Sequence, residues 1–174
     1  MNKEKLIKSV RNISDFPIPG IQFKDITTLF KDTECLQILS DMLYDTYKNK
    51  GITKVVAIES RGFIMAPILA TRLNAGFVPI RKPGKLPAET IETTYNKEYG
   101  TDTIQMHKDA IDNNDTILLH DDLLATGGTM KAAYELVKIL NPKYVYINFI
   151  IELEELRGRI IFDKDIQIES ILKM

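Results

Sequence analysis

Short apolar runs alternate along the chain with stretches in which apolar residues recur at helical spacing. The apolar runs predict β-strands, several of them buried on both faces as in a parallel sheet covered by helices. We expect these strands at residues 55–58, 77–80, 103–107, 116–120 and 144–151, with a last one at 166–171. Helical spacing predicts helices over the first dozen residues and at residues 32–51, 63–73 and 129–140. This alternation indicates an α/β fold with a mostly parallel central sheet flanked by helices.

Two segments do not follow this alternation of predicted strands and helices. Residues 82–100 contain two prolines, two glycines and many polar residues, which predicts a long exposed loop or hairpin. Long loops in compact domains are often lids over an active site. Residues 12–30 are partly apolar and rich in proline, and they either tie the N-terminus to the core or form a hood. In such a hood, Phe23 can stack on a heteroaromatic base.

Composition narrows the classes of function. The 174 residues are 44% hydrophobic and 27% charged, which is ordinary for one globular domain spanning residues 1–174. A net charge of −1 provides no basic field for nucleic acid. One cysteine, Cys35, and two histidines argue against a thiolate zinc site and fit a reducing compartment. The N-terminus lacks the apolar core of a secretory signal, and no apolar run approaches the ~20 residues of a membrane span, so we expect a cytoplasmic protein.

The run ILLHDDLLATGGT at residues 117–129 carries the strongest functional signal. Asp121 and Asp122 follow a buried strand, where open α/β sheets bind ligands, and carboxylates there can accept hydrogen bonds from sugar hydroxyls. Gly127 and Gly128 then allow a tight turn, and the helix that follows offers unpaired N–H groups to a phosphate. The simpler interpretation of each half is an ordinary strand end and an ordinary turn. Together, in this order, they indicate a site for a sugar 5-phosphate.

Further polar clusters follow the neighbouring predicted strands. Arg61 lies in a turn that can bind a second anion, and three cations at residues 81–85 can neutralise a leaving pyrophosphate. Glu98, in the expected lid, can serve as an acid or base once water is excluded. Taken alone, Arg61 is equally well a solvated arginine in a simple turn, whereas the cations at 81–85 and Glu98 are more simply read as solvated surface groups. His120 is expected to be a strand residue packed in the sheet, and the acids at 152, 154 and 155 to begin a solvated helix.

The motif at residues 117–129 resembles the phosphoribosyl pyrophosphate signature of type I phosphoribosyltransferases. Further motifs occur in the order seen in the adenine phosphoribosyltransferase family, and the similarity extends from about residue 12 to residue 151. They are D-F-P-x-P-G-x-x-F-x-D-I at 15–26, E-S-R-G-F at 59–63, R-K-x-G-K-L-P at 81–87, E-Y-G at 98–100 and D-D-L-L-A-T-G-G-T at 121–129.

The resemblance implies the type I phosphoribosyltransferase fold, with a flexible lid and a hood over the base pocket. It also implies an activity, which is transfer of the phosphoribosyl group from phosphoribosyl pyrophosphate to adenine, giving AMP and pyrophosphate in purine salvage. The implied cofactor is Mg²⁺, held mainly by the substrate, with Asp121 and Asp122 contacting it through water or ribose. A homodimer is implied as well, while neither a nucleic acid nor a membrane is expected as a partner.

The resemblance also implies a role for each matching residue. The ribose and its 5-phosphate are bound by Asp121, Asp122, Ala125, Thr126, Gly127, Gly128 and Thr129. Pyrophosphate is bound by Ser60, Arg61, Arg81, Lys82 and Lys85, in some cases from a dimer neighbour. The base is bound by Gln22, Phe23, Lys24 and Leu123. The implied catalytic residues are Glu98 and Tyr99.

Two alternatives stay open on the sequence. Lys24 stands where many relatives carry arginine, which leaves room for a 6-oxopurine such as hypoxanthine, guanine or xanthine. A non-catalytic regulator that senses phosphoribosyl pyrophosphate is the other alternative. Such regulators generally carry a DNA-binding domain or a basic face, and the net charge of −1 argues against one here.

Overall fold

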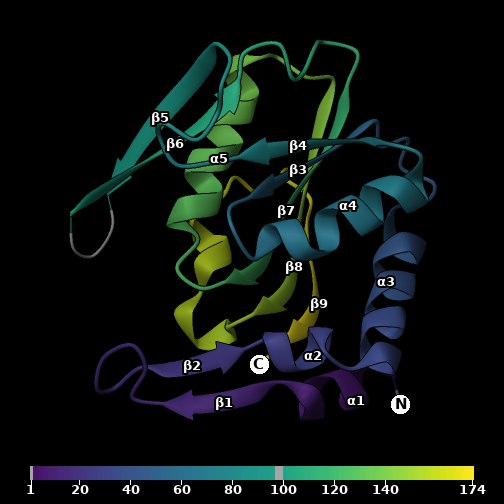
Figure 1. Ribbon diagram of the computed structural model, residues 1–174, viewed down its shortest axis with the longest axis vertical. Coiled ribbons are helices and arrows are strands. Elements are labelled where there is room, and N and C mark those ends of the chain that lie inside the picture. Colours follow the sequence, from purple (N-terminus) through teal and green to yellow (C-terminus); the bar gives the residue numbers. More distant parts are fainter. Residues whose placement is uncertain (1, 97–99) are drawn as a thin grey trace.

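The computed structural model describes residues 2–96 and 100–174. Its centre is a sheet of parallel strands in the order β4-β3-β7-β8-β9 (Figure 1). These strands are β3 Lys54–Ile58, β4 Gly76–Ile80, β7 Thr116–Leu124, β8 Tyr144–Glu152 and β9 Ile168–Lys173. The predicted fold class, a mostly parallel sheet flanked by helices, is confirmed. The last strand begins two residues later than predicted.

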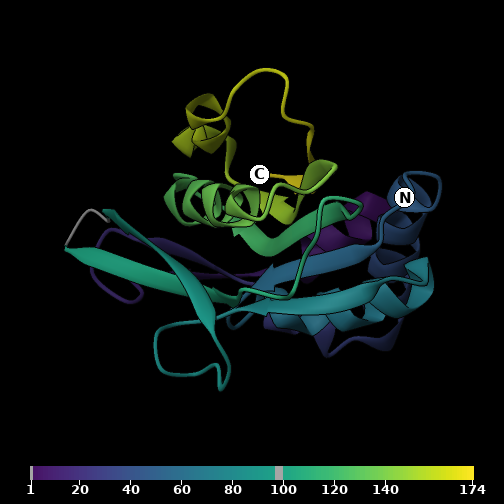
Figure 2. The same ribbon diagram turned by 90° about the horizontal axis from the view of Figure 1, so that it is seen from above.

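Helices cover both faces of this sheet. Figure 2 shows α5 (Gly128–Ile139) on one face and α4 (Gly62–Leu73) on the other. The face that carries α4 also packs against α1 (Asn2–Ser9), α2 (Thr27–Phe30) and α3 (Thr33–Tyr47). Along β7, Ile117 and Leu119 join the core beneath α5, whereas Leu118 joins the core beneath α3 and α4. The strand is apolar at successive positions because both of its faces are buried.

The predicted helices form close to their expected bounds because their start and stop signals are local. The Asp32 carboxylate accepts a hydrogen bond from the Cys35 amide at 2.8 Å and caps α3. The turn after α3 contains Gly51 in the left-handed region at φ +64°. The charge-rich N-terminal helix is shorter than expected, and it is anchored to the core by the fully buried Leu6.

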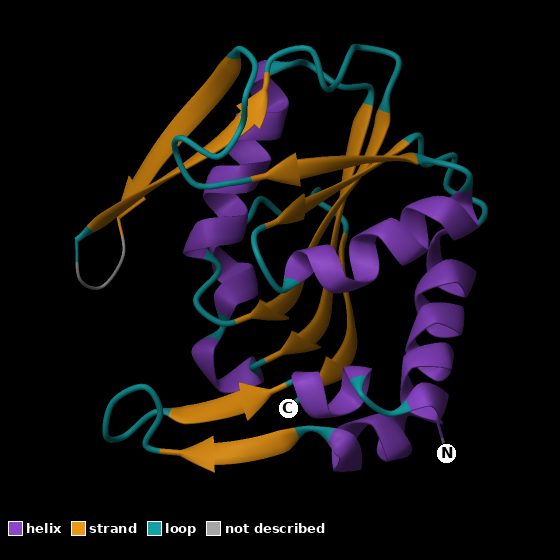
Figure 3. Ribbon diagram, in the orientation of Figure 1, coloured by secondary structure: helices purple, strands orange, loops and turns teal. Residues whose placement is uncertain are grey.

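Two antiparallel hairpins lie outside the central sheet (Figure 3). The first pairs β1 (Arg11–Ser14) with β2 (Gln22–Asp25) and builds the expected hood. The second pairs β5 (Thr90–Asn96) with β6 (Thr101–His107), so much of the lid predicted at residues 82–100 is a hairpin. Backbone hydrogen bonds of 2.9 and 2.7 Å between Arg81 and Gln105 join this hairpin to the end of β4.

The central strand β7 is longer than predicted. It pairs with β3 only as far as His120, opposite Ala57, but it pairs with β8 as far as Leu124, opposite Glu152. Asp121 therefore lies within the strand and not after it, because β8 provides a partner that the local sequence does not reveal. Beyond the end of β3, none of the described strands pairs with that side of β7, and Asp121 and Asp122 line a cavity.

The expected solvated acidic helix start at residues 152–155 is wrong for Glu152 and is confirmed for Glu154 and Glu155, which begin a short 3₁₀ helix. Glu152 is the last residue of β8, is 5% exposed and forms an ion pair with Arg159. Glu154 and Glu155 are exposed and begin a 3₁₀ turn, Glu154–Leu156, which a second turn, Gly158–Ile161, follows. The helices within the described ranges are all too short or too polar to cross a membrane.

Candidate active site

A cavity of about 410 Å³ lies where β3, β4 and β7 end, beside the β5–β6 hairpin. It brings together most of the residues predicted to bind ribose and pyrophosphate. Its walls are formed by Ile58, Glu59, Ser60, Arg61, Ile80, Arg81, Lys82, Tyr95, Asp102, Ile104, Asp121, Asp122 and Thr129. Acids and cations of distant sequence positions therefore meet at one edge of the sheet, as expected for an open α/β fold.

A second cavity, of about 220 Å³, lies over the turn between β7 and α5. It shares Arg61, Asp121, Asp122 and Thr129 with the first cavity. It adds the predicted residues Leu123, Ala125, Thr126, Gly127 and Gly128. A sugar bound at the two aspartates would therefore have a cationic cavity on one side and a glycine turn on the other.

Asp121 and Asp122 are poorly neutralised. The Arg61 Nε atom lies 2.7 Å from Oδ2 of Asp122, whose side chain is 5% exposed. Burial and the neighbouring Asp122 charge raise the pKa of Asp121 well above its ordinary value. Burial also raises the pKa of Asp122, although the Arg61 charge acts in the opposite direction. The pair is therefore suited to bind hydrogen-bond donors or a cation.

Glu59, which directly follows β3, has the opposite environment. The Arg81 Nε atom and the Lys82 backbone N–H donate to its Oε2 at 3.2 and 3.1 Å, and Lys85 forms an ion pair with its Oε1. The Lys85 hydrogen bond, with those from Lys82 and Arg81, lowers the pKa of Glu59 to about 2. Glu59 was not among the predicted functional residues. The cation cluster at residues 81–85 was the available signal, because it follows the strand beside β3.

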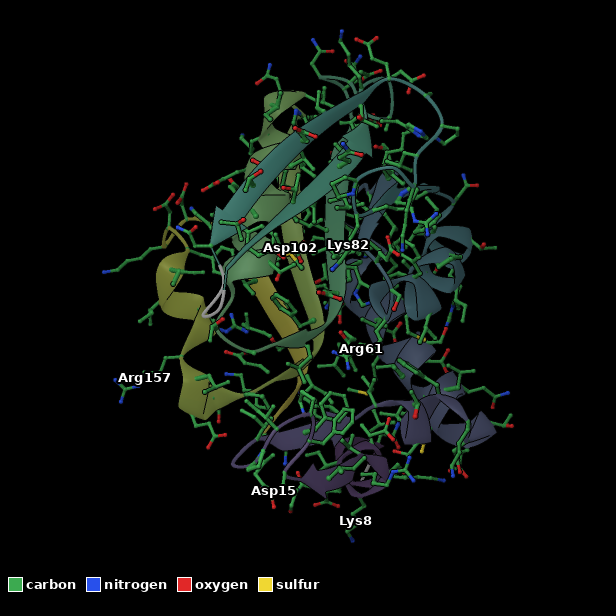
Figure 4. The ribbon with its side chains drawn as sticks, turned by 60° about the vertical axis from the view of Figure 1, so that its left-hand side comes forward. Lys8, Asp15, Arg61, Lys82, Asp102 and Arg157 are labelled. Atoms are coloured by element: carbon green, nitrogen blue, oxygen red, sulfur yellow. The ribbon has the colours of Figure 1, made fainter. Side chains whose placement is uncertain are left out.

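The predicted pyrophosphate-binding cations each form an ion pair with a carboxylate. Besides the pairs already described, the Lys82 Nζ atom lies 3.4 Å from Oδ2 of Asp102 on β6. Figure 4 shows Lys82 and Asp102 side by side, with Arg61 between this pair and the β1–β2 hairpin. Asp102 was also missed from the sequence, because its position depends on how β6 lies over the end of β4.

The hood contacts the cavity through Arg61 and Phe23. The Arg61 guanidinium carbon lies 5.4 Å from the centre of the Phe23 ring, and Phe16 packs edge-on against that ring at 5.1 Å. None of the three predicted base residues of the hood, Gln22, Phe23 and Lys24, lines either cavity, and Phe23 reaches the site only through its contact with Arg61. The side chain of Gln22 accepts hydrogen bonds from Asn12 and Ser14, and Lys24 is paired with Asn12 in the hairpin.

The turn between β7 and α5 has the backbone geometry that its glycines predict. Gly127 has φ +88°, a conformation that favours glycine, and α5 begins at Gly128, one residue earlier than expected. The Thr129 hydroxyl lies 3.1 Å from the hydroxyl of Tyr95, which reaches across from β5. The alternation of Ile91 and Tyr95 on one face of β5 was the signal that could have identified this contact.

His120 is fully buried in the sheet, as predicted. Its Nδ1 lies 2.8 Å from the side-chain oxygen of Asn148 on β8. Burial lowers the pKa of His120 to about 4, so the ring is neutral near pH 7. The predicted catalytic residues Glu98 and Tyr99 lie outside the described residues.

Comparison with known proteins agrees with this geometry. A family model of the phosphoribosyl transferase domain matches residues 25–168. An adenine phosphoribosyltransferase of Bacteroides thetaiotaomicron is 71% identical over 174 residues, which cover 100% of this chain and 99% of that protein. The chain belongs to the adenine phosphoribosyltransferase family.

Solved structures from this family share the fold over nearly the whole chain. An adenine phosphoribosyltransferase from Rhodothermus marinus has a TM-score of 0.93 and 46% identity, covering 99% of this chain and 98% of that one. The enzyme from Giardia lamblia, complexed with 9-deazaadenine, has a TM-score of 0.94 and 38% identity, covering 100% and 98%. The chain therefore shares the fold of these adenine phosphoribosyltransferases along nearly its whole length.

Proposed function

We propose that the protein transfers the 5-phosphoribosyl group from phosphoribosyl pyrophosphate to adenine, giving AMP and pyrophosphate. The observation that carries the proposal is that two cavities share Asp121 and Asp122, one lined by cations and the other by the glycine turn. That arrangement fits a sugar with phosphate groups at both ends. Relatives that the chain matches over nearly their whole length bear the name of this reaction, which supports adenine as the base.

In the proposed complex, Asp121 and Asp122 accept hydrogen bonds from the ribose hydroxyls. Their raised pKa values indicate that the free protein leaves their charges incompletely balanced. The ribose hydroxyls donate hydrogen bonds that balance part of the charge on these two carboxylates. The backbone N–H groups of residues 125–129 bind the 5-phosphate at the start of α5. One substrate is then held at two points, which fixes the orientation of its anomeric carbon.

Pyrophosphate is proposed to bind at Ser60, Arg61, Arg81, Lys82 and Lys85. The four cations of this set are already paired with carboxylates, so an incoming pyrophosphate requires additional positive charge. The carboxylate oxygens of Asp121 and Asp122 would contact Mg²⁺ through water or ribose, so the site fits a magnesium ion that is held mainly by the substrate and arrives with it. When bound, Mg²⁺ supplies charge that offsets the pyrophosphate oxygens. Glu59 meanwhile holds Arg81 and Lys85 beside the turn between β3 and α4. These two side chains are therefore already ordered before pyrophosphate binds.

The base is proposed to stack between Phe23 and Leu123, with the backbone near Gln22 and Lys24 contacting its edge. Arg61 covers Phe23 and also pairs with Asp122, so it blocks both subsites in the free protein. We propose that Arg61 turns toward pyrophosphate when the substrate binds, which frees the Phe23 ring for adenine. Glu98 and Tyr99 are proposed to be the catalytic residues, with Glu98 exchanging a proton with the purine.

Turnover with each purine base tests this proposal. The purified protein is incubated with phosphoribosyl pyrophosphate, Mg²⁺ and adenine, hypoxanthine, guanine or xanthine, and nucleotide and pyrophosphate are measured. We expect product with adenine and at most trace product with the others. Comparable turnover of a 6-oxopurine would favour that alternative, and binding of phosphoribosyl pyrophosphate without turnover of any base would favour a regulator.

The proposal includes a homodimer in the cytoplasm. The exposed apolar side chains Ile64, Ile68 and Phe77 lie on α4 and the edge strand β4, and they offer a surface for a second copy. The buried free thiol of Cys35 fits a reducing compartment. Light scattering should give twice the mass of one chain, and Ile68→Asp should shift that mass toward the monomer. A monomeric wild-type protein would contradict the dimer.

A further inference from the structure

The segment that follows β8 packs directly behind the turn between β7 and α5. The Leu153 N–H donates to the Leu124 carbonyl at 2.9 Å, which keeps the two chain segments together. Further along, the backbones of Gly158 and Gly127 are in close contact. A Cβ atom on Gly127 would lie 2.7 Å from the Gly158 carbonyl oxygen, and one on Gly158 would lie 2.2 Å from the Ala125 carbonyl oxygen. The path of the turn is therefore set by the position of residue 158.

Arg159 anchors this segment. Its Nε and Nη2 atoms lie 2.6 and 2.8 Å from the two carboxylate oxygens of Glu152, at the end of β8. The same side chain also contacts β9. Its Nη1 donates to the Ile168 carbonyl at 2.6 Å, and its Nη2 donates to the Ser170 hydroxyl at 3.2 Å. A guanidinium can make all of these bonds in one plane, whereas a lysine ammonium cannot.

Arg157 lies only two residues away but points outward. Figure 4 shows its side chain extending from the edge of the molecule into solvent, and the residue is exposed. The two arginines therefore carry the same charge on the same segment, but of the two it is Arg159 that contacts the end of β8 and the first half of β9. This difference provides a matched pair for an experiment.

We propose that Gly158 and Arg159 are positioning residues for the phosphate-binding turn at residues 125–128. Arg159 fixes the segment against the sheet, and Gly158 presses on the backbone of Ala125 and Gly127, so that the N–H groups of the turn converge on one point. Converging N–H groups bind phosphate only if they are held to within a fraction of an ångström. The inference rests on the proposed function, because it takes the turn to be the 5-phosphate site.

The experiment compares the dissociation constants of AMP and adenosine by calorimetry. Their ratio isolates the contribution of the 5-phosphate, since the two ligands differ only in that group. We expect wild-type protein and Arg157→Gln to bind AMP at least roughly 100-fold more tightly than adenosine. In Arg159→Gln the ratio should fall roughly tenfold while adenosine affinity is unchanged. Arg159→Lys should give a ratio between those of wild-type protein and Arg159→Gln. Gly158→Ala should lower the ratio more than Arg159→Gln does, because its Cβ atom displaces Ala125.

The outcomes separate this inference from the proposed function. If wild-type protein binds AMP and adenosine equally, the 5-phosphate site itself is wrong. If wild-type protein prefers AMP and the variants at 158 and 159 keep that preference, the positioning role is wrong. An equal loss of both ligands would also overturn it, because a general structural effect does not select the phosphate. Should Arg159→Gln fail to fold, Arg159→Lys retains the charge and gives the same comparison.

Discussion

Glu59 follows β3 and the Asp121–Asp122 pair lies within the neighbouring strand β7; all three line the same cavity, but their electrostatic environments are opposite. Glu59 accepts hydrogen bonds from Arg81, Lys82 and Lys85, and its pKa is lowered to about 2. The two aspartates are more deeply buried and have one cation between them, and their pKa values are raised. Three donors of the protein satisfy the Glu59 carboxylate, whereas the two aspartates share the single cation Arg61.

This difference separates a structural acid from ligand-binding acids. Charges that the fold already balances add to its stability, whereas charges that only a ligand can balance reduce it. We therefore expect substitutions of the two kinds to change the free energy of unfolding in opposite directions. A third acid, Glu98, is predicted to move a proton instead of balancing a charge, and it extends the comparison to turnover.

The largest effect is expected for Glu98→Gln, which should lower turnover roughly 10²–10⁴-fold because a positioned proton donor is removed. Steady-state kinetics with adenine and phosphoribosyl pyrophosphate measure this change. The control is Glu92→Gln on β5, since the exposed Glu92 carboxylate contacts Gln105 and lies outside both cavity walls. Unchanged turnover in Glu98→Gln would remove this residue from the mechanism.

A smaller effect is expected for Asp122→Asn. This change removes a buried acceptor for the ribose and should weaken binding of phosphoribosyl pyrophosphate roughly 100-fold. Adenine, which does not contact the ribose subsite, should bind with nearly unchanged affinity. Calorimetric titration of the two ligands checks the difference, and equal losses would count against Asp122 as a ribose ligand.

Glu59→Gln should lower the free energy of unfolding by about 1–2 kcal/mol at pH 7, because three donors lose a charged acceptor and solvent screens part of the loss. The pKa of a free glutamate is about 4.3, and that of Glu59 is lowered to about 2. Its stabilisation is therefore present above about pH 4.3 and is lost as the pH falls toward 2. Denaturant unfolding of wild-type and variant protein across this range measures it.

Glu89→Gln is the control for that experiment. Glu89 also forms an ion pair, with Lys108 at 2.9 Å, but its side chain is 76% exposed and the pair should contribute little. If Glu59→Gln and Glu89→Gln have the same effect, Glu59 is an ordinary surface acid and the comparison with the aspartates fails.

The smallest effect is expected for Asp121→Asn, and it has the opposite sign. The pKa of Asp121 is raised, so folding disfavours the ionised form and the free energy of unfolding falls as the pH rises through that pKa. Removing the charge should stabilise the free protein by about 1 kcal/mol at pH 7. Thermal unfolding measures the gain, with the exposed Asp109→Asn as control; destabilisation would show that Asp121 is already balanced.

The parts of the fold that depend on local signals could be predicted from the sequence. The Asp32 cap and the apolar spacing after it are sufficient to place α3, and continuous apolar runs identify the buried strands. The extension of β7 past His120 could not be predicted, because it depends on pairing with β8, which is remote in sequence. The same reason applies to Glu152, whose burial depends on Arg159 and on β9.

Some residues of the candidate site could be predicted from the sequence, and others could not. Asp121, Asp122 and the glycine turn are contiguous in the chain, so their proximity was readable as a motif. Glu59 and Asp102 become part of the cavity only when β3, β4 and β6 are arranged side by side. The functional roles of all these residues, and of Glu98 and Tyr99, stay predictions until the variants are measured.

The position of Arg61 has a consequence for inhibitor design. Its guanidinium group covers the Phe23 ring and contacts Asp122, so a purine analogue and a sugar analogue that bind separately must each compete with it. A compound that joins the two halves displaces this side chain in a single event. We expect such a linked compound to bind more tightly than the product of the separate affinities would indicate.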